Sequence, residues 1–223
     1  MRFPQRKDKY MPSVKISASI LNCDLANLAS EVKKASDGGA DYIHVDIMDG
    51  EFVPNISFGS SVQASAVPHI TRPMVVDTHL MIMHPQNFIS DFAAAHSDII
   101  TFHIESDCNP DDVISEIHSK GIKAGIAIKP KTPAEAVLPY IDKVEMILVM
   151  TVEPGYGGQK FMSDMLDKIR TIRAAAKDID IQVDGGINAE TAKLVKEAGA
   201  NVLVAGSYLY RAEDMESAVN SLR

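Results

Sequence analysis

The sequence predicts an α/β fold with a parallel sheet. Short β-rich runs alternate with helix-like stretches from Lys15 onward, and no linker or low-complexity segment separates them. Eight such units of about 28 residues each suit a single closed (β/α)8 barrel, the TIM barrel, with an eight-stranded parallel core. The length of 223 residues also favours one undivided domain. An open doubly wound sheet is the alternative, because sequence alone does not reveal closure.

Eight runs rich in β-branched and apolar residues are expected to form the strands in chain order. Several of them are apolar on both faces, as in parallel strands that are covered by helices. The expected strands span residues 15–21, 42–48, 74–81, 99–104, 123–128, 146–152, 181–184 and 202–205.

Amphipathic stretches between these runs predict helices over residues 25–35, 110–120, 163–177 and 190–198. Many are followed by a glycine, the residue expected where a helix ends: Gly38 and Gly39, Gly121, and Gly199. The first twelve residues are polar and lack the apolar core of a signal peptide, so residues 1–12 are expected to be a flexible extension and residues 13–223 the catalytic barrel.

The composition narrows the classes of function. A hydrophobic fraction of 46% supports a large core, and a formal charge of −8 argues against binding to a nucleic-acid backbone. No apolar run approaches the length of a membrane span. Cys23 and Cys108 do not form a Cys-x-x-Cys pair or suggest a disulfide framework. These features fit a cytoplasmic protein. A homo-oligomer is also expected, because barrels of this kind often associate through helix faces.

Two histidines and two aspartates stand at predicted strand ends. His44 and Asp46 are two residues apart in one strand, so their side chains share a face, while His79 and Asp184 close two other strands. In a barrel the catalytic groups gather at the C-terminal ends of the strands. These four residues, named the His/Asp cluster here, form a plausible cage for a divalent metal, and its carboxylates could act as acid and base.

Glycine-bearing turns follow the last three predicted strands. Backbone amides in such turns can converge on an anion, and loops after the seventh and eighth strands are the usual phosphate site of this architecture. The turns contain Gly155, Tyr156, Gly157 and Gly158, then Gly185 and Gly186, then Gly206 and Ser207. Together with a metal between two aspartates, they suit proton abstraction beside the carbonyl of a small ketose phosphate.

Long motifs spread over six of the strands carry a resemblance to a known family. They read Ser19-Ile-Leu, His-Val-Asp-Ile-Met-Asp-Gly-Glu-Phe-Val-Pro-Asn, His79-Leu-Met, Met150-Thr-Val-Glu-Pro-Gly-Tyr-Gly-Gly-Gln-Lys-Phe and Val-Asp184-Gly-Gly-Ile-Asn. From about Lys15 onward the chain resembles ribulose-phosphate 3-epimerases.

The resemblance implies interconversion of D-ribulose 5-phosphate and D-xylulose 5-phosphate through a metal-stabilised enediolate. It implies that the His/Asp cluster (His44, Asp46, His79 and Asp184) ligates one divalent metal per subunit, and that Asp46 and Asp184 exchange protons with opposite faces of C3. Zinc, iron(II), manganese and cobalt all suit two His and two Asp, with zinc preferred.

The same resemblance assigns substrate contacts and a site lining. The implied substrate contacts are Ser19, His79, Gly155, Tyr156, Gly157, Gly158, Gly185, Gly186, Gly206 and Ser207. Met48, Met81 and Met150 are expected to line the site, where uncharged side chains could exclude water without competing for the metal.

Other interpretations remain open from sequence. The nearest is 3-epimerisation of a longer ketose phosphate such as D-allulose 6-phosphate. A decarboxylase or aldolase on a related barrel would be expected to carry Asp-x-Lys where this chain reads His44-Val-Asp46. A sensor that binds a sugar phosphate without catalysis is the third. His103, close to Glu105, is expected to play a structural or supporting role outside the metal cage, and Asp49 to form a turn.

Overall fold

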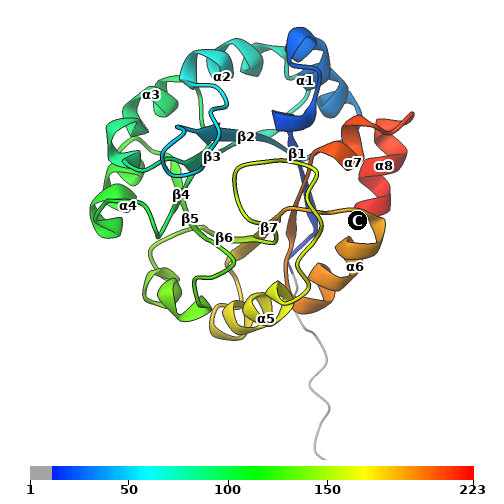
Figure 1. Cartoon of the computed structure of the whole chain (residues 1–223). Coiled ribbons are helices and arrows are strands. Elements are labelled where there is room, and N and C mark those ends of the chain that lie inside the picture. The colour runs from blue at the N-terminus through cyan, green and yellow to red at the C-terminus, as the bar shows by residue number, and fades with distance from the viewer. Residues whose placement is uncertain (1–11) are drawn as a thin grey trace, which may run out of the picture.

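The computed structural model of the chain describes residues 12–223. The expected extension over residues 1–12 lies outside the described residues except for Pro12. Within this range eight parallel strands form a closed barrel in chain order (Figure 1). Strand β1 pairs with β2 on one side and with β8 on the other, which closes the ring. The predicted TIM barrel is therefore confirmed, and the open sheet is excluded.

The strands agree closely with the expected runs. They are β1 (Lys15–Ser19), β2 (Tyr42–Met48), β3 (Val75–Met81), β4 (Ile99–His103), β5 (Lys123–Ile128), β6 (Met146–Met150), β7 (Asp180–Asp184) and β8 (Val202–Ala205). Strand β1 ends two residues earlier than expected because Ser19 caps a 3-10 turn, η1 (Ile20–Asn22), by accepting a hydrogen bond from the backbone N–H of Leu21.

Helices surround the barrel on the outside (Figure 1). They are α1 (Leu28–Asp37), α2 (Ser60–Ala66), α3 (Ile89–Ala94), α4 (Pro110–Ser119), α5 (Met165–Ala175), α6 (Ala189–Ala198), α7 (Ser207–Tyr210) and α8 (Met215–Leu222). Short 3-10 turns are η2 (Leu25–Asn27), η3 (Val67–His69), η4 (Pro85–Asn87), η5 (Ala134–Ala136) and η6 (Leu138–Tyr140). The expected helix over residues 25–35 therefore begins with a 3-10 turn.

The connection between β5 and β6 departs from the regular alternation. In its described residues, 129–145, it contains the 3-10 turns η5 and η6 and no α-helix. Pro130, Pro133 and Pro139 lie along it, and each removes a backbone donor and restricts the preceding residue. This spacing of prolines accounts for the missing helix.

The barrel interior is built in layers of residues from alternate strands, as expected of this fold. Tyr42, Ile99, Met146 and Val202 pack together as an apolar layer. The next layer toward the C-terminal ends is polar and comes from the odd-numbered strands β1, β3 and β7, which contribute Ser17, Asp77 and Gln182. In this layer Asp77 Oδ2 accepts hydrogen bonds from Ser17 Oγ at 3.1 Å and from Gln182 Nε2 at 2.5 Å. The polar layer supports the C-terminal mouth, where the His/Asp cluster lies.

One long loop crosses the C-terminal mouth. This segment, residues 151–164, follows β6 and passes in front of the barrel opening in Figure 1. Two hydrogen bonds join it to the loop after β2: Tyr156 Oη donates to the carbonyl of Pro54 at 2.7 Å, and Asn55 Nδ2 donates to the carbonyl of Gly155 at 2.8 Å. The loop is therefore held over the strand ends from the opposite side of the barrel.

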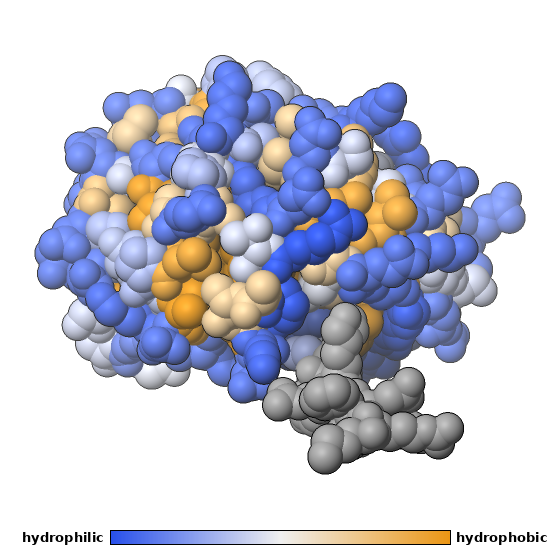
Figure 2. Space-filling view, turned by 90° about the horizontal axis from the view of Figure 1, so that it is seen from below, coloured by the Kyte–Doolittle hydropathy of each residue, from blue (hydrophilic) through white to orange (hydrophobic). Residues whose placement is uncertain are grey.

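Figure 2 shows the molecule from below the orientation of Figure 1. This side carries mostly hydrophilic residues, with apolar residues in small groups. Among the described residues, no helix combines the length and apolarity that crossing a bilayer requires. Cys23 and Cys108 are both free thiols.

Candidate active site

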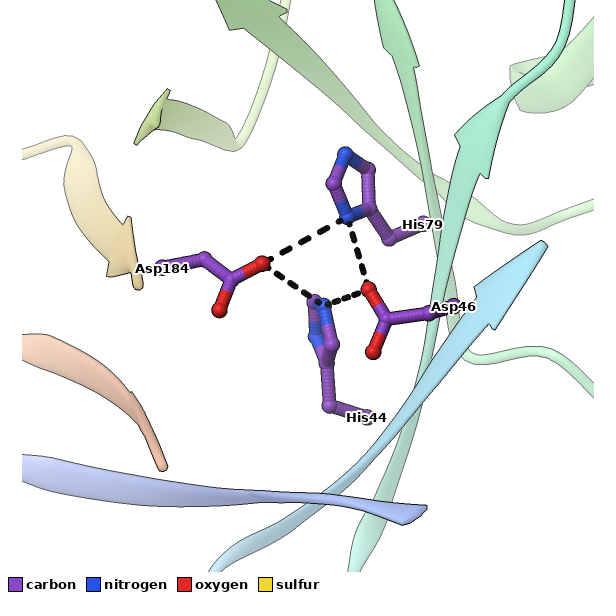
Figure 3. A group of neighbouring side chains, drawn as sticks. All are labelled: His44, Asp46, His79 and Asp184. Atoms are coloured by element: carbon purple, nitrogen blue, oxygen red, sulfur yellow. Dashed lines mark hydrogen bonds and ion pairs between the residues drawn. The ribbon is translucent and has the colours of Figure 1, made fainter. Parts of the chain in front are cut away.

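The His/Asp cluster assembles at the C-terminal mouth, with His44 and Asp46 from β2, His79 from β3 and Asp184 from β7 (Figure 3). His44 Nε2 and His79 Nδ1 lie 3.3 and 3.2 Å from Asp46 Oδ1, and each lies 3.9 Å from Asp184 Oδ2. All four ligand atoms fall within 4.8 Å of one another. The structure thus brings together the residues that the sequence singled out, and the group could hold a metal ion.

Strand geometry explains this convergence. His44 and Asp46 share the inward face of β2, and the parallel register sets Asp46 directly beside His79 on β3. Asp184 enters from β7, so that its carboxylate faces the other three residues from across the mouth (Figure 3).

Asp77 fixes the orientation of His44. The two residues are opposite each other in the β2 and β3 register, and His44 Nδ1 donates to Asp77 Oδ2 at 2.7 Å. In its neutral form, the one that can bind a cation, His44 therefore has its lone pair on Nε2, which points into the His/Asp cluster and is buried without a hydrogen-bond partner. A buried nitrogen acceptor that faces two carboxylates fits a cation ligand, and the donor set of two imidazoles and two carboxylates suits zinc, iron(II), manganese or cobalt.

The electrostatics show how strongly the cluster favours positive charge. Burial acts to lower the pKa of His44, but the charges of Asp46 and Asp77 outweigh it and raise this pKa well above its ordinary value. Burial likewise acts to raise the pKa of Asp46, yet attraction to His44, followed by the interaction with His79, holds it well below its usual range. Burial, followed by repulsion from Asp46, raises the pKa of Asp184 to about 6. These carboxylates create a demand for a cation at the centre.

His103 lies outside the four-residue group but touches it. Its Nε2 is 2.9 Å from His79 Nε2, and its Nδ1 is 3.1 Å from Glu105 Oε2. Burial lowers the pKa of His103 to about 4. Burial acts to raise the pKa of Glu105, but the interactions with His103, with the Thr132 hydroxyl and with the backbone N–H of Lys129 together outweigh it and lower this pKa to about 2. His103 is therefore a neutral imidazole next to an ionised carboxylate.

The cluster opens into a cavity of about 1040 Å³ at the mouth. Its lining includes the expected substrate contacts Ser19, Gly155, Tyr156, Gly157, Gly158, Gly185, Gly186, Gly206 and Ser207, together with Asp46, Asp184, Met48, Met81 and Met150. His44 and His79 are fully buried and contact Asp46 instead. Ser19 Oγ also donates to Asp46 Oδ2 at 2.7 Å, which leaves Asp46 Oδ1 to face the imidazoles.

Sequence reasoning missed Asp77 and Asn22. Asp77 could have been found from its place two residues before His79, which sets both on the same face of β3. Asn22 lies under the long loop, where a Cβ added to Gly157 would stand 2.1 Å from Asn22 Nδ2. Its position directly after the first expected strand was the available signal. Asp49, by contrast, forms the expected turn, because its Oδ1 accepts from the backbone N–H groups of Glu51 and Phe52.

Comparison with known proteins agrees with this geometry. The profile of the ribulose-phosphate 3 epimerase family matches residues 15–210. The chain belongs to the ribulose-phosphate 3-epimerase family. It is 43% identical over 215 residues to the ribulose-phosphate 3-epimerase of Bacillus subtilis, covering 94% of this chain and 98% of that one. For the Schizosaccharomyces pombe enzyme of the same name, identity is 41% over 214 residues, with 96% and 94% covered.

The relatives extend to archaea, and the expected enzyme family is confirmed. The ribulose-phosphate 3-epimerase of Methanocaldococcus jannaschii is 45% identical over 214 residues, with 94% of this chain and 90% of that one covered. Among solved structures, 3-hexulose-6-phosphate synthase from Salmonella typhimurium superposes with a TM-score of 0.69 at 18% identity, covering 93% of this chain and 96% of that one. At that identity the likeness concerns the fold alone.

Two glycines of this epimerase-family chain offer a matched test of the loop geometry. Gly186 and Gly158 both have left-handed backbone, with φ of 68° and 74°. A Cβ on Gly186 would stand 2.6 Å from the backbone nitrogen of Phe161, whereas one on Gly158 would meet nothing within 4 Å. Gly158→Ala is expected to lower the free energy of unfolding by about 1 kcal/mol through backbone strain alone.

Gly186→Ala is expected to cost about 2 kcal/mol more than Gly158→Ala, because the backbone of Phe161 must also move. Urea unfolding monitored by circular dichroism measures both values. Equal losses in the two variants would contradict the close approach of Gly186 to the loop after β6.

Proposed function

We propose that residues 13–223 form a catalytic domain that interconverts D-ribulose 5-phosphate and D-xylulose 5-phosphate by inverting C3. The observation that carries this proposal is the pair Asp46 and Asp184, which approach one centre from β2 and β7 across the mouth. Inversion needs a carboxylate on each face of a planar intermediate, because a single base would return the proton to its original face. The family and the names of the relatives support the substrate.

In the forward direction Asp46 removes the proton from C3, and Asp184 delivers a proton to the opposite face. The two roles reverse in the other direction. Ser19 holds the Oδ2 atom of Asp46 through its hydroxyl, which fixes the plane of that carboxylate beside the cavity. A divalent cation bound to the His/Asp cluster would stabilise the negative charge that develops on the substrate oxygens at C2 and C3.

The rest of the cavity binds and shields the substrate. The loops with Gly185, Gly186, Gly206 and Ser207 offer backbone N–H groups to the phosphate. Met48, Met81 and Met150, each at most 4% exposed, line the reacting end and exclude water without offering charged ligands that compete for the cation.

Deuterium incorporation tests this reaction. Cation-loaded protein is incubated with D-ribulose 5-phosphate in deuterated water, and proton NMR follows the product and its C3 position. The two-base mechanism predicts D-xylulose 5-phosphate with deuterium at C3, since the proton delivered by Asp184 comes from solvent. If the product instead keeps the original C3 proton in every turnover, the proton removed from one face is the one delivered to the other. That result would contradict a mechanism in which Asp46 takes one proton and Asp184 delivers a different one from solvent.

The substrate is tested by comparing kcat/KM for D-ribulose 5-phosphate and D-allulose 6-phosphate. We expect the pentose phosphate to be favoured at least about tenfold, which corresponds to about 1.4 kcal/mol in transition-state binding. Equal or reversed values would reassign the protein to longer ketose phosphates. Binding of both sugars without turnover in cation-loaded protein would indicate a sensor.

A further inference from the structure

A line of hydrogen bonds leaves the His/Asp cluster through His79, passes through His103 at the end of β4 and ends at Glu105 in the loop that follows. His79 Nε2 meets His103 Nε2 at 2.9 Å, and His103 Nδ1 meets Glu105 Oε2 at 3.1 Å. Both imidazoles are fully buried. None of the residues of β4 belongs to the cluster, so this contact gives the strand a role in the site.

The protons in this line can be assigned from the capacities of the groups. Two ring nitrogens at 2.9 Å share one proton, and a neutral imidazole has one donor and one acceptor. The ionised Glu105 only accepts, so His103 carries its proton on Nδ1 and accepts at Nε2. His79 must then donate from Nε2, which leaves the lone pair on its Nδ1, the atom that faces Asp46 and Asp184.

Glu105 is itself fixed at its other oxygen. Oε1 accepts from the backbone N–H of Lys129 at 2.8 Å and from the hydroxyl of Thr132. The loop that carries these donors is bound by Lys168, whose Nζ donates to the carbonyls of Lys129 at 2.9 Å and Pro130 at 3.0 Å. The carboxylate therefore cannot turn away from His103 without losing bonds to the loop after β5.

We propose that His103 and Glu105 are positioning residues that keep the proton of His79 on Nε2, so that Nδ1 presents its lone pair to a divalent cation in the His/Asp cluster. The inference rests on the cation site proposed above. His44 is oriented in the same way by Asp77, so each imidazole of the cluster has a carboxylate behind it, directly for His44 and through His103 for His79.

Glu105→Gln is expected to reverse the direction of hydrogen-bond donation along this line, with little change in the shape of the side chain. The backbone N–H of Lys129 and the hydroxyl of Thr132 need an acceptor, so the amide oxygen of the new side chain takes the place of Oε1. Its NH2 group then faces His103 Nδ1 and donates to it. His103 must carry its proton on Nε2, His79 must accept there, and the proton of His79 moves to Nδ1, where it blocks the cation.

A second histidine–glutamate pair provides the matched control. His118 Nε2 lies 3.1 Å from Glu145 Oε2, and Glu145 also accepts from the backbone N–H of Ala124 at 2.8 Å. Both side chains of this pair are exposed to solvent, and neither residue belongs to the His/Asp cluster. Glu145→Gln makes the same chemical change in a pair that does not contact a cluster residue.

The first readout is the Kd for Zn²⁺ and Co²⁺, measured by competition with a chromophoric chelator. Glu105→Gln is expected to weaken binding by about 10- to 100-fold, and Glu145→Gln to leave it unchanged. A Kd within twofold of wild type in Glu105→Gln would overturn the inference while the proposed function stands. Absence of divalent-cation binding by the wild type would refute the cation site itself, and this inference with it.

The second readout does not depend on the variant folding. Long-range ¹⁵N–¹H correlation NMR of the wild-type imidazoles reports which ring nitrogen carries the proton. Protonation of His79 at Nε2 and of His103 at Nδ1 is expected. The opposite assignment for either ring would overturn the inference, whatever the affinity for cations.

Discussion

Replacing Asp184 with Asn is expected to reduce kcat for epimerisation by about 10⁴-fold, the upper end of what a positioned acid or base contributes. The variant should still exchange the C3 proton of D-ribulose 5-phosphate with deuterated water, because Asp46 can remove a proton from that substrate and return one to the same face. It should not exchange the C3 proton of D-xylulose 5-phosphate. NMR of each substrate with the variant measures the two exchange rates.

The Asp46→Asn variant should show the mirror-image pattern, with exchange confined to D-xylulose 5-phosphate. Because both aspartates belong to the His/Asp cluster, the cation content of each variant is measured alongside, and exchange is compared at equal loading. Asp107→Asn alters a carboxylate that is 79% exposed and should retain wild-type turnover. Exchange from both epimers in either variant would contradict the assignment of one base to each face.

Removing the divalent cation with a chelator is expected to lower turnover by at least about 10³-fold, since electrophilic stabilisation of developing charge contributes several kcal/mol. The melting temperature should fall as well, because a ligand that binds only the folded state stabilises it. Without the cation, the carboxylates of Asp46, Asp77 and Asp184 remain around the buried imidazole of His44, with Asp77 at Nδ1 and the other two at Nε2. Turnover assays and differential scanning calorimetry measure the two effects.

Adding cations back distinguishes a specific site from general charge screening. Zinc, iron(II), manganese or cobalt should restore turnover, whereas calcium should not, because calcium prefers six to eight oxygen ligands and avoids imidazole. Full activity in protein shown by elemental analysis to be free of these metals would refute a catalytic cation.

The fold was predictable because its signals are local. Each strand is a short β-rich run, and the outward residues of these runs, such as Ile43, Val76 and Ile147, pack into one core with the helices. The missing helix between β5 and β6 could also have been anticipated from Pro130, Pro133 and Pro139. The end of β1 was set by a weaker signal, the capping bond of Ser19, which competes with continued strand pairing only once the chain has turned.

The candidate site was predictable at its centre and not around it. His44 and Asp46 share a strand face, and His79 and Asp184 close two other predicted strands. The partners of these residues depend on the barrel's register: Asp77 reaches His44 because β2 and β3 pair in parallel at that step, and His103 reaches His79 across β3 and β4. In the sequence, Asp77 and His103 are polar residues within largely apolar runs. The strand register that brings them into contact with His44 and His79 is not visible there.

The pairing of β1 with β8 has a consequence for how the protein is made. A growing chain presents His44, Asp46 and His79 early, but Asp184 stands on β7, which takes its place in the ring only between β6 and β8. The ring itself closes when Val202 of β8 pairs with Lys15 of β1. Contacts between such distant segments form slowly. Binding of cobalt by all four residues of the His/Asp cluster would thus report that the barrel has closed. The moment of this binding would measure when folding is completed during translation.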